Sequence, residues 1–147
     1  MEVLVDTALD ATVRTGEAEV VRSLLDELAE LGDDALWEAA SLLLGLLATR
    51  PVYGGLGEHN GVERLRAVAR TADPVTALVL SLQAVHRAVG SIAAHEVWEE
   101  AAGTTQRLAL TQLFISVACT IGTGDRQLDP RRTVRLIRAA VIDASAA

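Results

Sequence analysis

The sequence predicts an all-α fold, a compact multi-helix bundle of seven or eight helices. Apolar residues recur three and four positions apart along most of the 147 residues, and this is the spacing of one face of an α-helix. Helix start and stop signals separate these stretches. No stretch alternates apolar and polar residues in the way that a half-buried strand does. Residues 1–147 are therefore expected to form a single all-helical domain.

Two helices are expected near the amino terminus, over about 2–14 and 17–31. In the second of them, leucine and valine residues fall on one face at helical spacing. Each stretch is followed by a glycine, Gly16 and Gly32, and glycine accepts the left-handed conformation at a helix end. The chain is thus expected to begin with a pair of helices.

The third helix is expected over about 33–49, with Asp33 or Asp34 as its cap. Its leucine-rich middle is apolar nearly all round, which is typical of a helix at the centre of a bundle. Pro51 ends it. The following stretch, 51–61, holds four glycines and is expected to be an irregular loop.

A short helix is expected over about 62–71, followed by a strong start signal. Asp73 supplies a cap and Pro74 suits the first position of a helix. The segment 74–102 is then one long helix or two. We favour a break at Gly90, because glycine is unfavourable inside a helix and the serine after it is a good cap.

The last two helices are expected from about Thr104 to 121 and from Asp129–Pro130 onward. Thr104 can cap the first of them, and the aspartate–proline pair repeats the earlier start signal. An apolar stripe runs along the first, with polar residues opposite: Leu110, Leu113, Phe114, Val117, Ala118 and Ile121 against Gln112, Ser116 and Thr120.

Composition excludes some environments and partners. Half of the residues are hydrophobic, 3% are aromatic, and the net charge is −7. No apolar run reaches the roughly 18 to 20 uninterrupted residues of a spanning helix, so no membrane association is expected. The acidic start predicts that the chain has no secretory leader. The protein is therefore expected to be cytoplasmic. An acidic chain without interleaved aromatic residues is not expected to bind nucleic acid.

The first candidate site is His95, Glu96 and Glu99. His95 and Glu99 are four positions apart and share a helix face, as two metal ligands or an acid–imidazole pair would. The cluster resembles the opening of the zincin motif His-Glu-x-x-His, but Glu99 stands where the second histidine belongs. The zincin function is therefore not transferred, and no metal or cofactor is expected. The alternative is a solvated acidic face on which Glu99 pairs with His95.

Tyr53, His59 and Asn60 form a second candidate, because they lie in the glycine-rich loop and loops often carry binding residues. The glycines match neither a P-loop nor a dinucleotide-binding fingerprint. A plain connection between two helices is the alternative reading of this loop.

Arg131, Arg135 and Arg138 form a third candidate, since their spacing places them on one helix face. Residues 1–49 hold eleven acidic residues and two arginines. The arginine stripe can dock on this acidic part in the same chain, dock on it in a second copy, or meet phosphate. We favour the charge-complementary readings.

Taken together, the sequence predicts a non-catalytic protein–protein interaction or regulatory protein that self-associates or binds another protein. No serine elbow or comparable nucleophile arrangement is present in the sequence. The first alternative is a helical-bundle enzyme or metal-binding protein that uses His95, Glu96 and Glu99. The second is a sensor that binds a small apolar ligand between helices.

Overall fold

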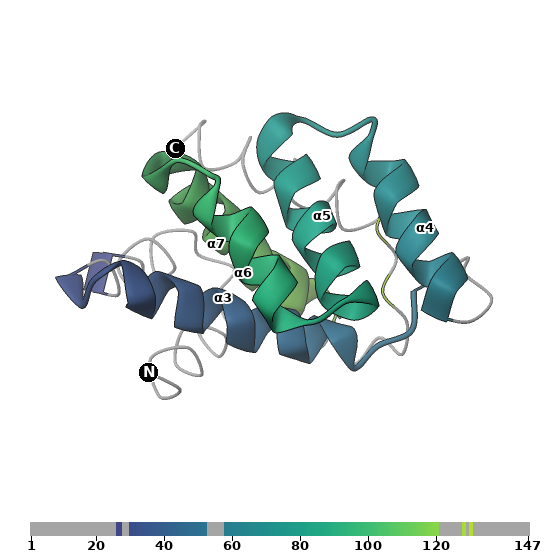
Figure 1. The fold of residues 1–147 in the computed structure, drawn as a ribbon, viewed down its shortest axis with the longest axis horizontal. Helices are drawn as coiled ribbons and strands as arrows, with labels where there is room; N and C mark the ends of the chain where they lie inside the picture. Colours follow the sequence, from purple (N-terminus) through teal and green to yellow (C-terminus); the bar gives the residue numbers. More distant parts are fainter. Residues whose placement is uncertain (1–25, 28–29, 53–57, 121–127, 129, 131–147) are drawn as a thin grey trace.

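The structure, a computed structural model, describes residues 26–27, 30–52, 58–120, 128 and 130. These residues form an all-helical fold (Figure 1), with helices α3 (Asp33–Ala48), α4 (Glu58–Ala69), α5 (Pro74–Ala88), α6 (Ser91–Glu99) and α7 (Gly103–Thr120). The predicted all-α class is confirmed.

The predicted number of helices is wrong, because the described residues hold five helices and not seven or eight. The prediction counted start and stop signals, which mark where a helix can begin. Three of the counted segments, over about 2–14, 17–31 and from 130 onward, lie wholly or largely outside the described residues. The single domain over 1–147 stays a prediction.

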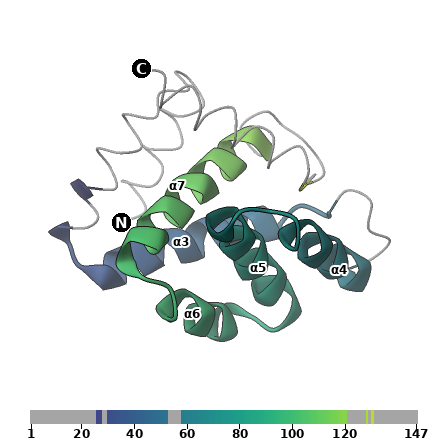
Figure 2. The same ribbon diagram turned by 90° about the horizontal axis from the view of Figure 1, so that it is seen from above.

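Helix α5 lies at the centre of the described part, where it packs against each of the other four helices. Figure 2 shows α4 beside α5 at one end and α6 at the outer edge, with α7 crossing over α3. One apolar cluster fills the space between them. Its largest fully buried members are Trp98, Phe114 and a set of leucines: Leu43, Leu44, Leu47, Leu65, Leu80, Leu82, Leu110, Leu113 and Leu128.

The start of α5 follows the expected chemistry. Asp73 is the N-cap, its side chain accepts a hydrogen bond of 3.2 Å from the backbone N–H of Thr76, and Pro74 occupies the first turn. Partial burial, the largest single cause, raises the pKa of the Asp73 carboxyl, but the hydrogen bonds from Thr76 and from the backbone of Asp73 and Val75 together hold the pKa below its ordinary 3.8. The aspartate–proline signal thus fixes where α5 begins.

The expected break after α5 is present at Gly90. The N–H of Val89 donates to the carbonyl of Val85 at 2.9 Å and closes α5. Gly90 has a φ of 130° and is the N-cap of α6, a conformation that favours glycine. Gly90 therefore turns the chain between the two helices, and Ser91 is the first residue of α6 instead of its cap.

Helix α4 begins at Glu58, four residues before the predicted start at 62. A Cβ atom at Gly61 would lie 3.2 Å from two side-chain atoms of Val52, which is buried. The glycine therefore lets α4 approach the segment that follows α3. The sequence interpretation counted Gly61 as a loop signal, whereas tertiary packing uses it inside a helix.

At two other helices, the residues expected as N-caps lie inside the helix instead of before it. Helix α3 has Gly32 as its N-cap, with a φ of 110°, and Asp33 and Asp34 lie in the first turn. There the two carboxylates complement the positive end of the helix dipole. Thr104 likewise lies within α7, which begins at Gly103.

Helix α3, which the sequence indicated as the central helix, is not buried all round, and α5 lies at the centre instead. Leu46 of α3 is exposed, so α3 is packed on part of its circumference. In contrast, α7 buries the described part of its apolar stripe, Leu110, Leu113, Phe114 and Val117, and also the polar residues Gln112, Ser116 and Thr120. The hydroxyl of Ser116 donates to the carbonyl of Gln112 at 2.8 Å, which satisfies the buried group within its own helix.

Outside the helices, one backbone contact joins distant parts of the chain. Val52 and Leu128 form an isolated parallel bridge, and the N–H of Leu128 donates to the carbonyl of Pro51 at 2.8 Å. Across the described ranges, no helix combines the length and the apolarity needed to cross a membrane.

Candidate functional site

Helix α6, which carries the first predicted site, is fixed to the bundle along its inner side. Ala94 and Trp98 point into the core and are buried. The side-chain amide of Gln106, in α7, donates to the carbonyl of Trp98 at 2.9 Å. These contacts hold the orientation of α6, so the residues on its outer side keep a defined position.

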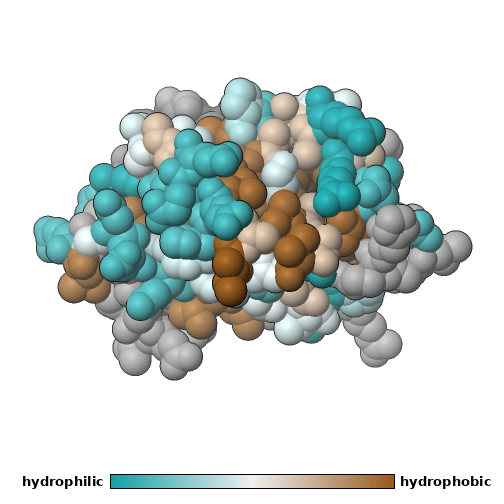
Figure 3. Space-filling view, viewed as in Figure 1, coloured by the Kyte–Doolittle hydropathy of each residue, from teal (hydrophilic) through white to brown (hydrophobic). Residues whose placement is uncertain are grey.

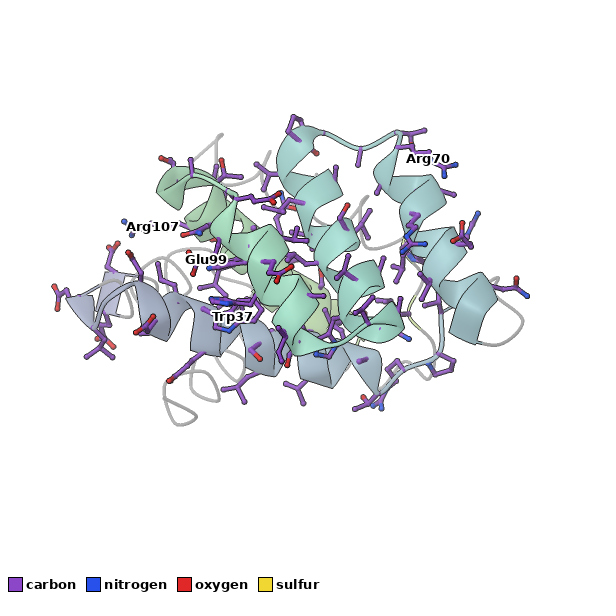
Figure 4. The ribbon with its side chains drawn as sticks, in the orientation of Figure 1. Trp37, Arg70, Glu99 and Arg107 are labelled. Carbon is purple, nitrogen blue, oxygen red and sulfur yellow. The ribbon has the colours of Figure 1, made fainter. Side chains whose placement is uncertain are left out.

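Trp37 of α3 packs against two aromatic side chains of α6. Its ring centroid lies 4.8 Å from that of His95 and 5.9 Å from that of Trp98, with tilts of 44° and 48°. Such tilted contacts are favourable for aromatic rings. Figure 4 shows Trp37 and Glu99 on the same side of the molecule, far from Arg70 on α4. The pattern of the sequence did not indicate this contact, because residues 37 and 95 are distant along the chain.

The three residues of the first candidate site do not act as one group. The Nε2 atom of His95 lies 2.9 Å from Oε1 of Glu99, and the two side chains are 43% and 63% exposed. Glu96 is exposed on the next stripe of the helix. In the described part of the chain, no three His, Cys, Asp or Glu side chains gather closely enough to hold a metal ion. The metal-binding and enzyme alternative stays a prediction.

The other predicted sites lie partly or wholly outside what the structure describes. Tyr53 is outside the described residues, and the side chain of His59 is not described. Asn60 is exposed on α4 instead of lying in a loop. The stripe of Arg131, Arg135 and Arg138 is outside the described residues.

The structure reveals an exposed apolar pair that the sequence analysis missed. Val89 and Ile92 flank Gly90 at the corner between α5 and α6, and they are 74% and 82% exposed. No other large apolar side chain of the described residues is as exposed. Figure 3 shows apolar side chains at the surface in the middle of this face, where Figure 1 places the corner. The predicted break at Gly90 was the signal in the sequence that could have indicated this exposure. Residues at a corner between two helices need not lie on the packed face of either helix.

Further along α6, toward its carboxyl end, the outer side of the helix becomes acidic. Ile92, Glu96 and Glu99 follow one another at helical spacing and are all exposed. The first turn of α6 holds no acidic residue and its last turn holds no basic one. The exposed surface of α6 is thus apolar at its beginning and acidic at its end.

His86, near the end of α5, is a half-buried ionisable group. Its Nδ1 atom is buried and has no hydrogen-bond partner among the described residues. Desolvation by burial lowers the pKa of the His86 imidazole below 6.5, and the positive charge of Arg87 lowers it further. The fold therefore favours the neutral form of this histidine.

This lowered pKa predicts a pH dependence of stability. Because the unfolded chain binds the proton more tightly, the free energy of unfolding should fall as the pH drops from 6.5 through the lower folded-state pKa. In His86→Gln this part of the loss should vanish. Urea denaturation from about pH 7.5 to about pH 5.5 measures the difference between the two proteins. Parallel pH profiles for both would contradict the prediction.

Compared with known proteins, the chain matches no family model, no curated protein and no solved structure. The described residues therefore provide the basis for a functional proposal. They offer an exposed apolar pair at the corner between α5 and α6, next to an acidic helix surface.

Proposed function

We propose that this protein is a non-catalytic interaction protein that associates with a second copy of itself. The observation that carries the proposal is the exposure of Val89 and Ile92 at the α5–α6 corner. Burying one aliphatic side chain of this size contributes about 1.5 to 3 kcal/mol. Two such side chains at one corner provide a driving force for association that a lone exposed residue does not.

The polar residues of the described part support an interaction role over a catalytic one. Catalytic acid–base groups usually lie in a recess, where burial and neighbouring charges adjust their pKa values. His95 and Glu99 instead lie on an open helix surface and pair within one helix. The contact of His95 with Trp37 positions α6, which is a structural task.

The proposal is tested by the mass of the protein in solution. Sedimentation velocity and light scattering over a wide range of concentrations should show an average mass that rises from the monomer toward the dimer. Val89→Ser combined with Ile92→Ser should shift this rise to higher concentration, since both side chains are exposed and contribute little to the fold. A wild-type protein that stays monomeric at every concentration would contradict the proposal.

A further inference from the structure

We infer that two copies pair through the outer side of α6, with the two α6 helices antiparallel. This inference rests on the proposed function and adds the surface, the orientation and the residues. The α6 face is defined as Val89, Ile92, Glu96 and Glu99. All four side chains are exposed, and the last three share one side of the helix.

The order of charge along α6 is the reverse of what its own helix dipole favours. The backbone N–H groups of a first turn carry partial positive charge and favour acidic neighbours, whereas the carboxyl end favours basic ones. In α6 the N-cap is Gly90, and no described side chain caps the first turn. Glu96 and Glu99 lie in the second half of this nine-residue helix. The placement of these two acidic residues is therefore unfavourable with respect to the dipole of α6 alone.

An antiparallel partner corrects this order. A two-fold axis near Ile92 brings the Ile92 side chains of both copies together, with Val89 beside them. Each Glu96 then lies near the first turn of the α6 helix in the other copy, where its negative charge is favourable. A two-fold interface uses the same patch on both subunits. The charged residues of the α6 face are both acidic, so the positive end of the partner's helix dipole provides the complement to Glu96.

The α6 face is prepared for docking because its inner side is fixed. Trp98 is buried, and Gln106 and Trp37 hold the helix from two other elements. Little conformational freedom is then lost on association. The face is small compared with the roughly 800 Å² that each partner buries in a standard interface, so the dimer should form in a concentration-dependent manner.

The decisive variant is Ile92→Glu, which places two like charges near the two-fold axis. Like charges at such a position are strongly unfavourable, and the dimer dissociation constant should rise at least about tenfold. The matched control is Leu31→Glu, because Leu31 is also large, apolar and 64% exposed but lies just before α3. Its dissociation constant should equal that of the wild type.

Glu96→Lys separates the electrostatic part, because its two effects have opposite signs. At concentrations where the wild type is monomeric, removing an acid from the end of α6 should raise the thermal midpoint by about 1 to 4 °C. The same change should weaken the dimer several-fold. Glu30→Lys alters the net charge equally on an exposed residue outside the α6 face and should leave the dimer unchanged.

The possible outcomes distinguish this inference from the proposed function. If either Ile92→Glu or Glu96→Lys leaves the dimer as strong as in the wild type, the α6 pairing is overturned, while self-association itself stands. A dimer that Leu31→Glu weakens as much as Ile92→Glu would overturn it as well. A monomeric wild type would overturn both. The inference is supported when the two α6 variants weaken the dimer and both controls leave it intact.

Discussion

Arg87→Met is expected to lower the free energy of unfolding by about 2 to 4 kcal/mol. Arg87, in α5, donates from one guanidinium nitrogen to the carbonyls of Leu47 at 2.7 Å and Arg50 at 2.5 Å. These carbonyls lie at and just beyond the end of α3, which has no basic residue in its own last turn. The positive charge of Arg87 thus complements the negative end of α3 from another helix. Methionine keeps an apolar stem of similar length but removes the two hydrogen bonds and the positive charge, so the Leu47 carbonyl keeps only the weaker bond from the N–H of Arg50 at 3.2 Å among those described.

Urea denaturation followed by circular dichroism measures this loss, and two variants sharpen its meaning. Arg87→Lys keeps the charge but not the planar fork of donors, so it should recover part of the stability. Arg66→Met is the matched control, since Arg66 is exposed and pairs with Glu63 within one helix at 2.9 Å. Its effect should stay within about 0.5 kcal/mol. An equal loss in Arg66→Met and Arg87→Met would show that the contact with α3 contributes nothing.

The change Gln83→Met should act in the opposite direction and stabilise the fold by about 1 to 3 kcal/mol. Gln83 is 2% exposed in the core, and neither atom of its amide has a hydrogen-bond partner in the part of the chain that the structure describes. Burying an unpaired amide is unfavourable. Methionine has a similar shape and brings no such group, so its substitution should fit the same space.

Gln106→Met provides a control with the opposite expected sign. The amide of Gln106 does have a partner, because it donates to the carbonyl of Trp98 at 2.9 Å. Its loss should lower the free energy of unfolding by about 1 kcal/mol. Chemical denaturation of both variants under the same conditions tests the pair. A lower stability of Gln83→Met would mean that its amide has a favourable interaction in the folded protein.

The local signals of the sequence predicted several helix boundaries correctly. Asp73 and Pro74 begin α5, and Gly90 separates α5 from α6. These features depend on residues within one turn of each other, so local chemistry is enough to place them. The start of α4 depends instead on how close Gly61 lies to Val52, and the glycine therefore misled an interpretation based on neighbours alone.

The candidate site was predictable only in part. The helical spacing of His95 and Glu99 indicated the pair that the structure contains at 2.9 Å. The spacing did not reveal the ring of Trp37 beside His95, since this contact joins two helices. Nor did it identify Val89 and Ile92 as the exposed pair, because an apolar residue in a sequence is equally compatible with the core.

The sequence by itself determined that the chain forms helices, where several of them begin and end, and which residues can share a face. These properties follow from the pitch of the helix and from hydrogen bonds at its ends. Only the tertiary structure decided that α5 lies at the centre, that Arg87 complements the end of α3, and that the corner at Gly90 leaves apolar side chains in solvent. An apolar face is encoded locally, but the element that covers it, or fails to cover it, is set by packing between residues far apart in the chain.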